Sequence, residues 1–359
     1  MKLENRLSFL SLKRQGIGHT DETLAEHFDW KEIQAFAEKQ GLSAILVNGI
    51  EKLPQEMLPP ISIKLQLIGD GMMVEQSAKQ QWDTSQKLVD YLKQKGIITV
   101  GLKGMTVAQW YPNPFQRDCC DFDCFLLKKG SDGTIAYAYE DGNRAVEAKG
   151  VNVDRSIYVH SVFDYKGLTV ENHHYLAAIK FSKRHRKMDD EFRSLLLEER
   201  LIPVRRSNLM MGSPLFNAVF LMHHAHRHTI NDYLPLKLLI DWTLFIENNS
   251  KLDWNRFWQY AEDFGMLRFA QAMTRGSIRL FGAKVPYELP TDFEADDLLE
   301  QCLWDTPEGT KGRSSRFERW LRIIFKLIHA RKKYKFFYDS SSFQMIVAYI
   351  KGFLFEDVD

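Results

Sequence analysis

Two aspartates two positions apart, Asp121 and Asp123, are the residues whose types and spacing most clearly suggest chemistry in this sequence. They lie in a run, 118–127, where acidic residues alternate with phenylalanine and cysteine. Successive side chains of a β-strand leave opposite faces, so both carboxylates would project from one face, about 6.6 Å apart along the backbone. Two carboxylates placed in this way can share a divalent cation. The spacing therefore predicts a metal site, with an ordinary solvated strand face as the alternative.

A third acid, Glu171, lies in a segment that is expected to form the second strand of a hairpin. The segments 156–165 and 168–175 flank the dipeptide Lys166-Gly167, which is typical of a tight turn. Period-two alternation places Thr169, Glu171 and His173 on one face of that strand. Glu171 would join the aspartates if its strand lies beside theirs, and would otherwise be a solvated acid.

An apolar, β-branched segment at 97–102 precedes Lys103 and Gly104. A strand that runs into a glycine turn lets backbone N–H groups approach a phosphate. Lys103 and Arg117 are suited to triphosphate oxygens as a point charge and as a two-pronged donor, respectively. For both, the alternative is a solvated surface charge.

A family resemblance links these motifs. The segments at 102–104, 111–112, 117, 121–123 and 170–173 resemble the uncharacterised bacterial nucleotidyltransferase family, a distant branch of the polymerase-β-like nucleotidyltransferase superfamily. The resemblance extends through 224–228 and 239–242, so it covers most of the chain.

The resemblance implies an α+β fold, in which a small mixed β-sheet core is flanked by N-terminal and C-terminal helical regions. It implies that Asp121, Asp123 and Glu171 are catalytic and bind Mg²⁺ or Mn²⁺, with an NTP as substrate and Gly104 at the phosphate turn. The superfamily commonly has Gly-Ser at this turn, whereas here Met105 follows the glycine.

The function expected from the resemblance is metal-dependent transfer of an NMP group from an NTP to an acceptor hydroxyl, with release of pyrophosphate. The departure at Met105 keeps an alternative open, namely a catalytically inactive nucleotide-binding or partner-binding module with the same fold.

Four histidines fall within 223–228, and His224 and His228 share a helix face at i, i+4 spacing. We expect this pair to bind nucleotide, with core or surface histidines as the alternative. Zinc is not favoured, because no glutamate follows in the zincin arrangement and no cysteine lies nearby.

The periodicity divides the chain into a helical region at 1–95, an α/β core at 96–180 and a helical domain at 181–359. Asp29 begins a capping box, and Gly41 is expected to end that helix. The other expected helices are at 44–52, at 61–94 with a possible break near Gly69 and Gly71, at 105–110, 135–149, 216–227, 234–247, 254–264 and 317–330.

The charges nearly cancel, with 48 Lys and Arg against 47 Asp and Glu, which argues against a general polyanion binder. The acceptor is therefore expected to be a small molecule or a protein rather than a nucleic acid. The basic aromatic run at 331–338 suits either a helix end or a single-strand binder, and the helix end is favoured. No membrane span or secretory signal is expected, and the four cysteines suggest a reduced, cytoplasmic protein.

Overall fold

The computed structural model describes residues 29–180, 182–231, 233–304 and 331–337. It is an α+β protein, as predicted. By its internal contacts the chain divides into two compact units. Of the described residues, the first unit contains 29–176, 193–213 and 280–282, and the second contains those of 177–192, 214–279, 283–304 and 331–337.

The described part of the first unit, from residue 29 on, starts with three helices, α2 (Trp30–Gln40), α3 (Ser43–Ile50) and α4 (Ile61–Gln94). The Asp29 side chain accepts a hydrogen bond from the Glu32 N–H, and Gly41 ends α2 with φ of 64°, so both predicted caps are confirmed. The predicted break in α4 was wrong. Gly71 instead lets α3 approach α4 closely, because a Cβ at this position would lie 3.0 Å from Val47 Cγ2.

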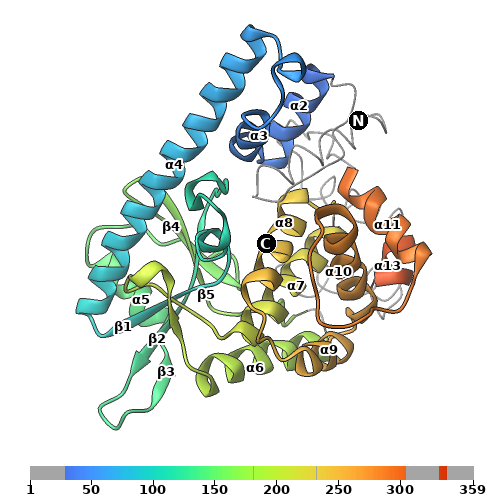
Figure 1. Cartoon of the computed structure of the whole chain (residues 1–359). Helices are drawn as coiled ribbons and strands as arrows, with labels where there is room; N and C mark the ends of the chain where they lie inside the picture. Colours follow the sequence, from blue (N-terminus) through green and yellow to red (C-terminus); the bar gives the residue numbers. More distant parts are fainter. Residues whose placement is uncertain (1–28, 181, 232, 305–330, 338–359) are drawn as a thin grey trace, which may run out of the picture. The chain divides into compact units, whose positions relative to one another are not determined.

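The same unit contains a mixed sheet of seven strands among the described residues, ordered β4-β5-β2-β1-β7-β6 with β3 also paired to β2. Strands β1 to β5 are labelled in Figure 1. Strand β2 runs antiparallel to β1 and β3 and parallel to β5, while β1 runs parallel to β7. The strands are β1 (Ile97–Gly101), β2 (Phe122–Lys129), β3 (Ile135–Tyr137), β4 (His160–Tyr165), β5 (Leu168–His173), β6 (Ile202–Pro203) and β7 (Met210–Met211).

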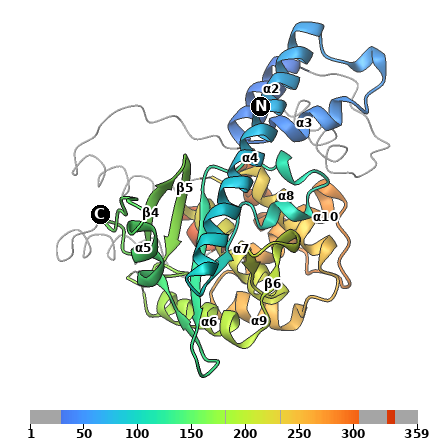
Figure 2. The ribbon, with the colours of Figure 1, turned by 90° about the vertical axis from the view of Figure 1, so that its left-hand side faces the viewer.

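The C-terminal part of α4 and the helix α5 (Tyr139–Glu147) pack on the apolar face of this sheet (Figure 2). Alternation along β2 directs Phe122, Cys124 and Leu126 into that core. A buried polar contact fastens α5 to the sheet, because Asn143 Oδ1 accepts hydrogen bonds from Ser161 Oγ and Asn172 Nδ2. Residues that alternate with these core residues therefore leave the opposite face.

Three local expectations need correction. The helix expected at 135–149 is divided into β3 and α5, because residues 135–137 pair with the end of β2. The helix expected at 105–110 is a 3₁₀ turn, η2 (Val107–Trp110), and further 3₁₀ turns lie at Gln55–Met57, Pro114–Gln116 and Val204–Arg206. Strand β2 begins at Phe122, so Asp121 immediately precedes it.

Helix α6 (Lys183–Glu198) crosses from the second unit into the first, and the remaining described helices belong largely to the second unit. They are α7 (Pro214–Asn231), α8 (Leu236–Asn248), α9 (Trp254–Asp263), α10 (Leu267–Phe281), α11 (Phe293–Trp304) and α13 (Arg331–Phe337). Residues 331–337 of the basic aromatic run form helix α13, whereas Tyr338 and the helix expected at 317–330 lie outside the described residues.

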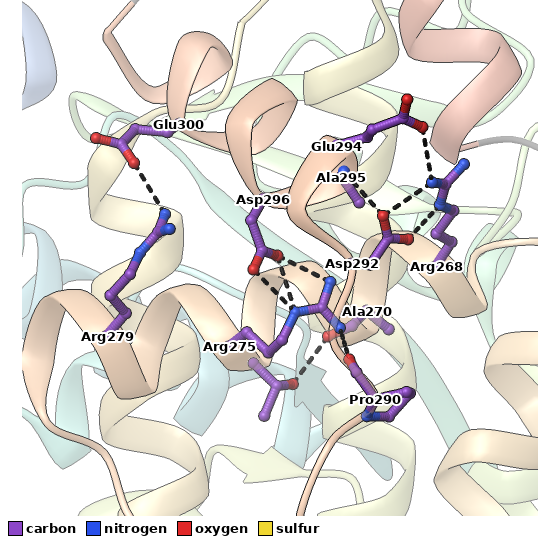
Figure 3. A network of polar contacts seen from close by, with 11 residues as sticks. Arg268, Ala270, Arg275, Arg279, Pro290, Asp292, Glu294, Ala295, Asp296 and Glu300 are labelled. Carbon is purple, nitrogen blue, oxygen red and sulfur yellow. Dashed lines mark hydrogen bonds and ion pairs between the residues drawn. The ribbon is translucent and has the colours of Figure 1, made fainter.

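Helices α10 and α11 are joined by a row of ion pairs, shown in Figure 3. Three arginines of α10 face one acid just before α11 and two acids within it. The pairs are Arg268 with Asp292, Arg275 with Asp296, and Arg279 with Glu300.

Among the helices that the structure describes, none combines the length and apolar character needed to cross a bilayer.

Candidate active site

Three carboxylates meet where β2 begins. Asp123 is the second residue of β2, and the parallel pairing of β2 with β5 places Glu171 directly beside it. Asp121 precedes the strand and turns its carboxylate toward the same point. One oxygen from each of the three residues lies within 4.8 Å of the others. The sheet thus gathers three acids from two separate segments of the chain.

Lys103 lies against two of these carboxylates. It follows the end of β1, which is antiparallel to β2 and so delivers the next residues to the point where β2 begins. The Lys103 Nζ is 2.8 Å from Asp123 Oδ2 and 3.8 Å from Asp121 Oδ2. An ammonium group thus partly neutralises the acids.

The Asp123 carboxylate is fully buried and carries a second cationic partner. Its Oδ1 lies 3.0 Å from His173 Nε2, while His173 Nδ1 lies 3.2 Å from the Tyr175 carbonyl oxygen and must donate to it. Burial alone would raise the pKa of Asp123, but the His173 hydrogen bond and the Lys103 charge outweigh it and hold that pKa well below its usual range. Asp123 is therefore ionised at neutral pH.

The pKa of Asp121 is shifted in the opposite direction, upward. Burial raises the pKa of its carboxyl group, and the negative charge of Asp123 raises it further, more than Lys103 lowers it. Glu171 adds to the repulsion. At Asp121 the repulsion from Asp123 and Glu171 therefore exceeds the attraction of Lys103 and Arg117, and a bound cation would relieve this repulsion.

Gly104, in the turn after β1, has a left-handed backbone conformation with φ of 57°. The Met105 side chain is buried in the core, and the Thr106 hydroxyl donates to the Lys103 carbonyl at 3.0 Å. Arg117 is also buried, and its Nη1 lies 3.1 Å from Cys119 Sγ. This burial contradicts the alternative prediction for Arg117, a solvated surface charge. Its positive charge lowers the pKa of Asp121.

His224 and His228 lie on α7 in the second unit, with their rings edge to face at 4.6 Å. They contribute to neither of the groups of possible metal ligands found among the described residues. Two other histidines, His160 and His173, had no predicted role and lie beside Glu171 on the sheet. Alternation did place His173 on the face of Glu171, whereas His160 is brought there only by the hairpin register.

Comparison with known protein families matches residues 26–282, well over half of the chain, to a family described as uncharacterised nucleotidyltransferases. The chain belongs to this family. The match includes Lys103, Gly104, Arg117 and all three carboxylates of the cluster. Searches of curated proteins and of solved structures found no match. Family membership thus identifies the protein as a nucleotidyltransferase, with a nucleotide as substrate.

Proposed function

We propose that this nucleotidyltransferase moves a nucleoside monophosphate from an NTP to an acceptor hydroxyl, releases pyrophosphate and depends on Mg²⁺ or Mn²⁺. The observation that carries the proposal is the meeting of Asp121, Asp123 and Glu171 within 4.8 Å. Hard carboxylate oxygens are the ligands that these cations prefer. The raised pKa of Asp121 reflects the burial and mutual repulsion that a bound cation would relieve.

When bound, a divalent cation would neutralise charge on the transferred phosphate and on the leaving pyrophosphate. Asp121 and Asp123 would hold it, and Glu171 would complete the ligand set and orient the acceptor hydroxyl. His173 would keep the Asp123 carboxylate in place through its hydrogen bond to Oδ1.

Two basic residues of the first unit have separate proposed roles. When a nucleotide binds, the Lys103 ammonium group would leave Asp123 and form an ion pair with phosphate oxygens of the nucleotide. Gly104 would let the adjacent backbone approach that phosphate, and Arg117 would add positive charge beside the turn, where its Nη1 lies 3.9 Å from the position of a Gly104 Cβ.

The proposal is tested by incubating the full chain with each α-labelled NTP, Mg²⁺ and a panel of sugars, antibiotics, proteins and RNA. We expect release of pyrophosphate and transfer of label to one acceptor class. Asp123→Asn and Glu171→Gln should each abolish both signals. Asp141→Asn serves as the matched control, since Asp141 belongs to an exposed ion pair with Arg144 in the same unit.

The buried Met105 and the engaged Thr106 hydroxyl favour a second candidate, a nucleotide-binding module without turnover. In that case the protein would bind an NTP with Mg²⁺, and no acceptor in the panel would become labelled. Loss of NTP binding in Asp123→Asn without any turnover in the wild type would decide for the module.

A further inference from the structure

A second group of possible metal ligands adjoins the carboxylates on the same sheet face. The register of β4 and β5 places His160 directly opposite His173, and Glu171 is two residues before His173 on the same face. His160 Nε2 lies 3.8 Å from Glu171 Oε1, and His173 Nε2 lies 3.6 Å from Glu171 Oε2. One ligand atom from each residue lies within 4.8 Å of the other two.

The orientation of His173 suits a ligand. Its Nδ1 donates to the Tyr175 carbonyl oxygen, which directs Nε2 toward the acids. A cation bound at Nε2 would replace the proton that Nε2 donates to Asp123 Oδ1 in the metal-free protein. Histidines that ligate metals usually donate their other ring N–H to a carbonyl or carboxylate in this way. The six consecutive residue pairs of the β4–β5 hairpin hold the two imidazoles in register, with ring centroids 5.1 Å apart.

The donor set differs in kind from that of the neighbouring carboxylates. Two imidazoles and one carboxylate are the ligands of many zinc sites that retain an open coordination position. Imidazole nitrogen favours borderline cations such as Zn²⁺ and Co²⁺, whereas Mg²⁺ prefers oxygen. We propose that His160, Glu171 and His173 form a second divalent-cation site, selective for Zn²⁺ or Co²⁺, beside the carboxylate cluster.

The site can be tested in the absence of nucleotide, so its test does not depend on nucleotidyl transfer. His160 is the decisive residue, because His173 also contacts Asp123 and Glu171 belongs to both groups. Asp121 provides the complementary probe, since it belongs to the carboxylate group alone.

The experiment is a titration of the metal-free full chain with Co²⁺, followed by its visible absorption and by competition with Zn²⁺. We expect one tight site, with affinity reduced at least tenfold in His160→Gln and unchanged in Asp121→Asn. The control is His174→Gln, a histidine of the same segment that stacks on Tyr139 at 4.4 Å and belongs to neither ligand group. Unchanged affinity in His160→Gln, or an equal loss in His174→Gln, would overturn the proposal.

A second measurement uses only the wild-type chain, in case His160→Gln fails to fold. Modification of histidines by diethyl pyrocarbonate is mapped by mass spectrometry with and without Zn²⁺. We expect Zn²⁺ to protect His160 and His173 at least fivefold and to leave His174 unprotected. Equal modification of His160 in the two conditions would mean that this group is an ordinary polar cluster. Should Mg²⁺ fail to bind the carboxylates while Zn²⁺ protects His160, the proposed function would fall and this site would stand.

Discussion

Replacement of Lys103 by methionine separates the two roles that the site assigns to this residue. In the absence of a cation, the Lys103 ammonium lies 2.8 Å from Asp123 Oδ2 and compensates a carboxylate whose side chain has no exposed surface. A divalent cation held by Asp123 would have to displace that ammonium. Methionine keeps the apolar part of the side chain and removes the charge. Lys103→Met is therefore expected to lower the stability of the metal-free protein and to raise its affinity for a divalent cation.

The magnitude follows from the burial of Asp123. Removing one partner of a buried ion pair costs about 3 to 5 kcal/mol, because the remaining charge stays buried without compensation. His173 still contacts Asp123 Oδ1 at 3.0 Å, so we expect the lower end, about 3 kcal/mol. For a unit of this size that loss corresponds to a fall in Tm of about 6 to 12 °C.

The assay is thermal unfolding of wild type and Lys103→Met with and without saturating Mg²⁺. We expect Mg²⁺ to raise the Tm of the variant more than that of the wild type, since no ammonium has to be displaced. Lys128→Met is the control, because Lys128 is half exposed and 3.9 Å from Asp141, and such a pair contributes less than about 1 kcal/mol. An unchanged apo Tm, or an equal Mg²⁺ shift in variant and wild type, would refute the reasoning.

Three further predictions concern the turn, the core of the first unit and the second unit. Gly104→Ala should destabilise by about 1 to 2 kcal/mol in urea unfolding, because Gly104 has φ of 57° and space for a Cβ, so the cost is backbone strain alone; Gly104→Asn should cost less. Asn143→Leu should cost about 2 to 4 kcal/mol in the same assay, since two buried donors lose their acceptor. Burial, together with nearby arginines, lowers the pKa of His185 to about 4, so this residue is neutral when folded and titrates near its usual 6.5 when unfolded. The unfolded state then binds more protons between these values, and stability should fall as the pH drops from about 6.5 to 4, by at most about 1.4 kcal/mol per pH unit.

Each of these has an outcome that contradicts it. Equal stabilities of Gly104→Ala and Gly104→Asn would mean that strain is not the cause. A neutral Asn143→Leu would show that the donors find other acceptors. For the pH prediction, a His185→Gln variant should have a shallower stability profile below pH 6.5, and a profile parallel to that of the wild type would exclude His185 as the source.

Much of the fold was predictable because local physics decides it. The capping box at Asp29, the glycine stop at Gly41 and the alternation around Asp123 depend on residues a few positions apart. The divided segment at 135–149 was mistaken for one helix because β3 exists only through its pairing with β2. Such pairing depends on a distant partner, which local periodicity does not contain.

The sequence by itself indicated that the carboxylates of Asp121 and Asp123 lie on one side of the chain, since the two residues are two positions apart. It also placed Glu171 and His173 on a common strand face. Only the tertiary structure decided that β5 lies parallel to β2, with Glu171 beside Asp123, and that His160 stands opposite His173. Strand order and register arise from packing of the whole sheet against α4 and α5, so residues remote in sequence meet only once that core is formed.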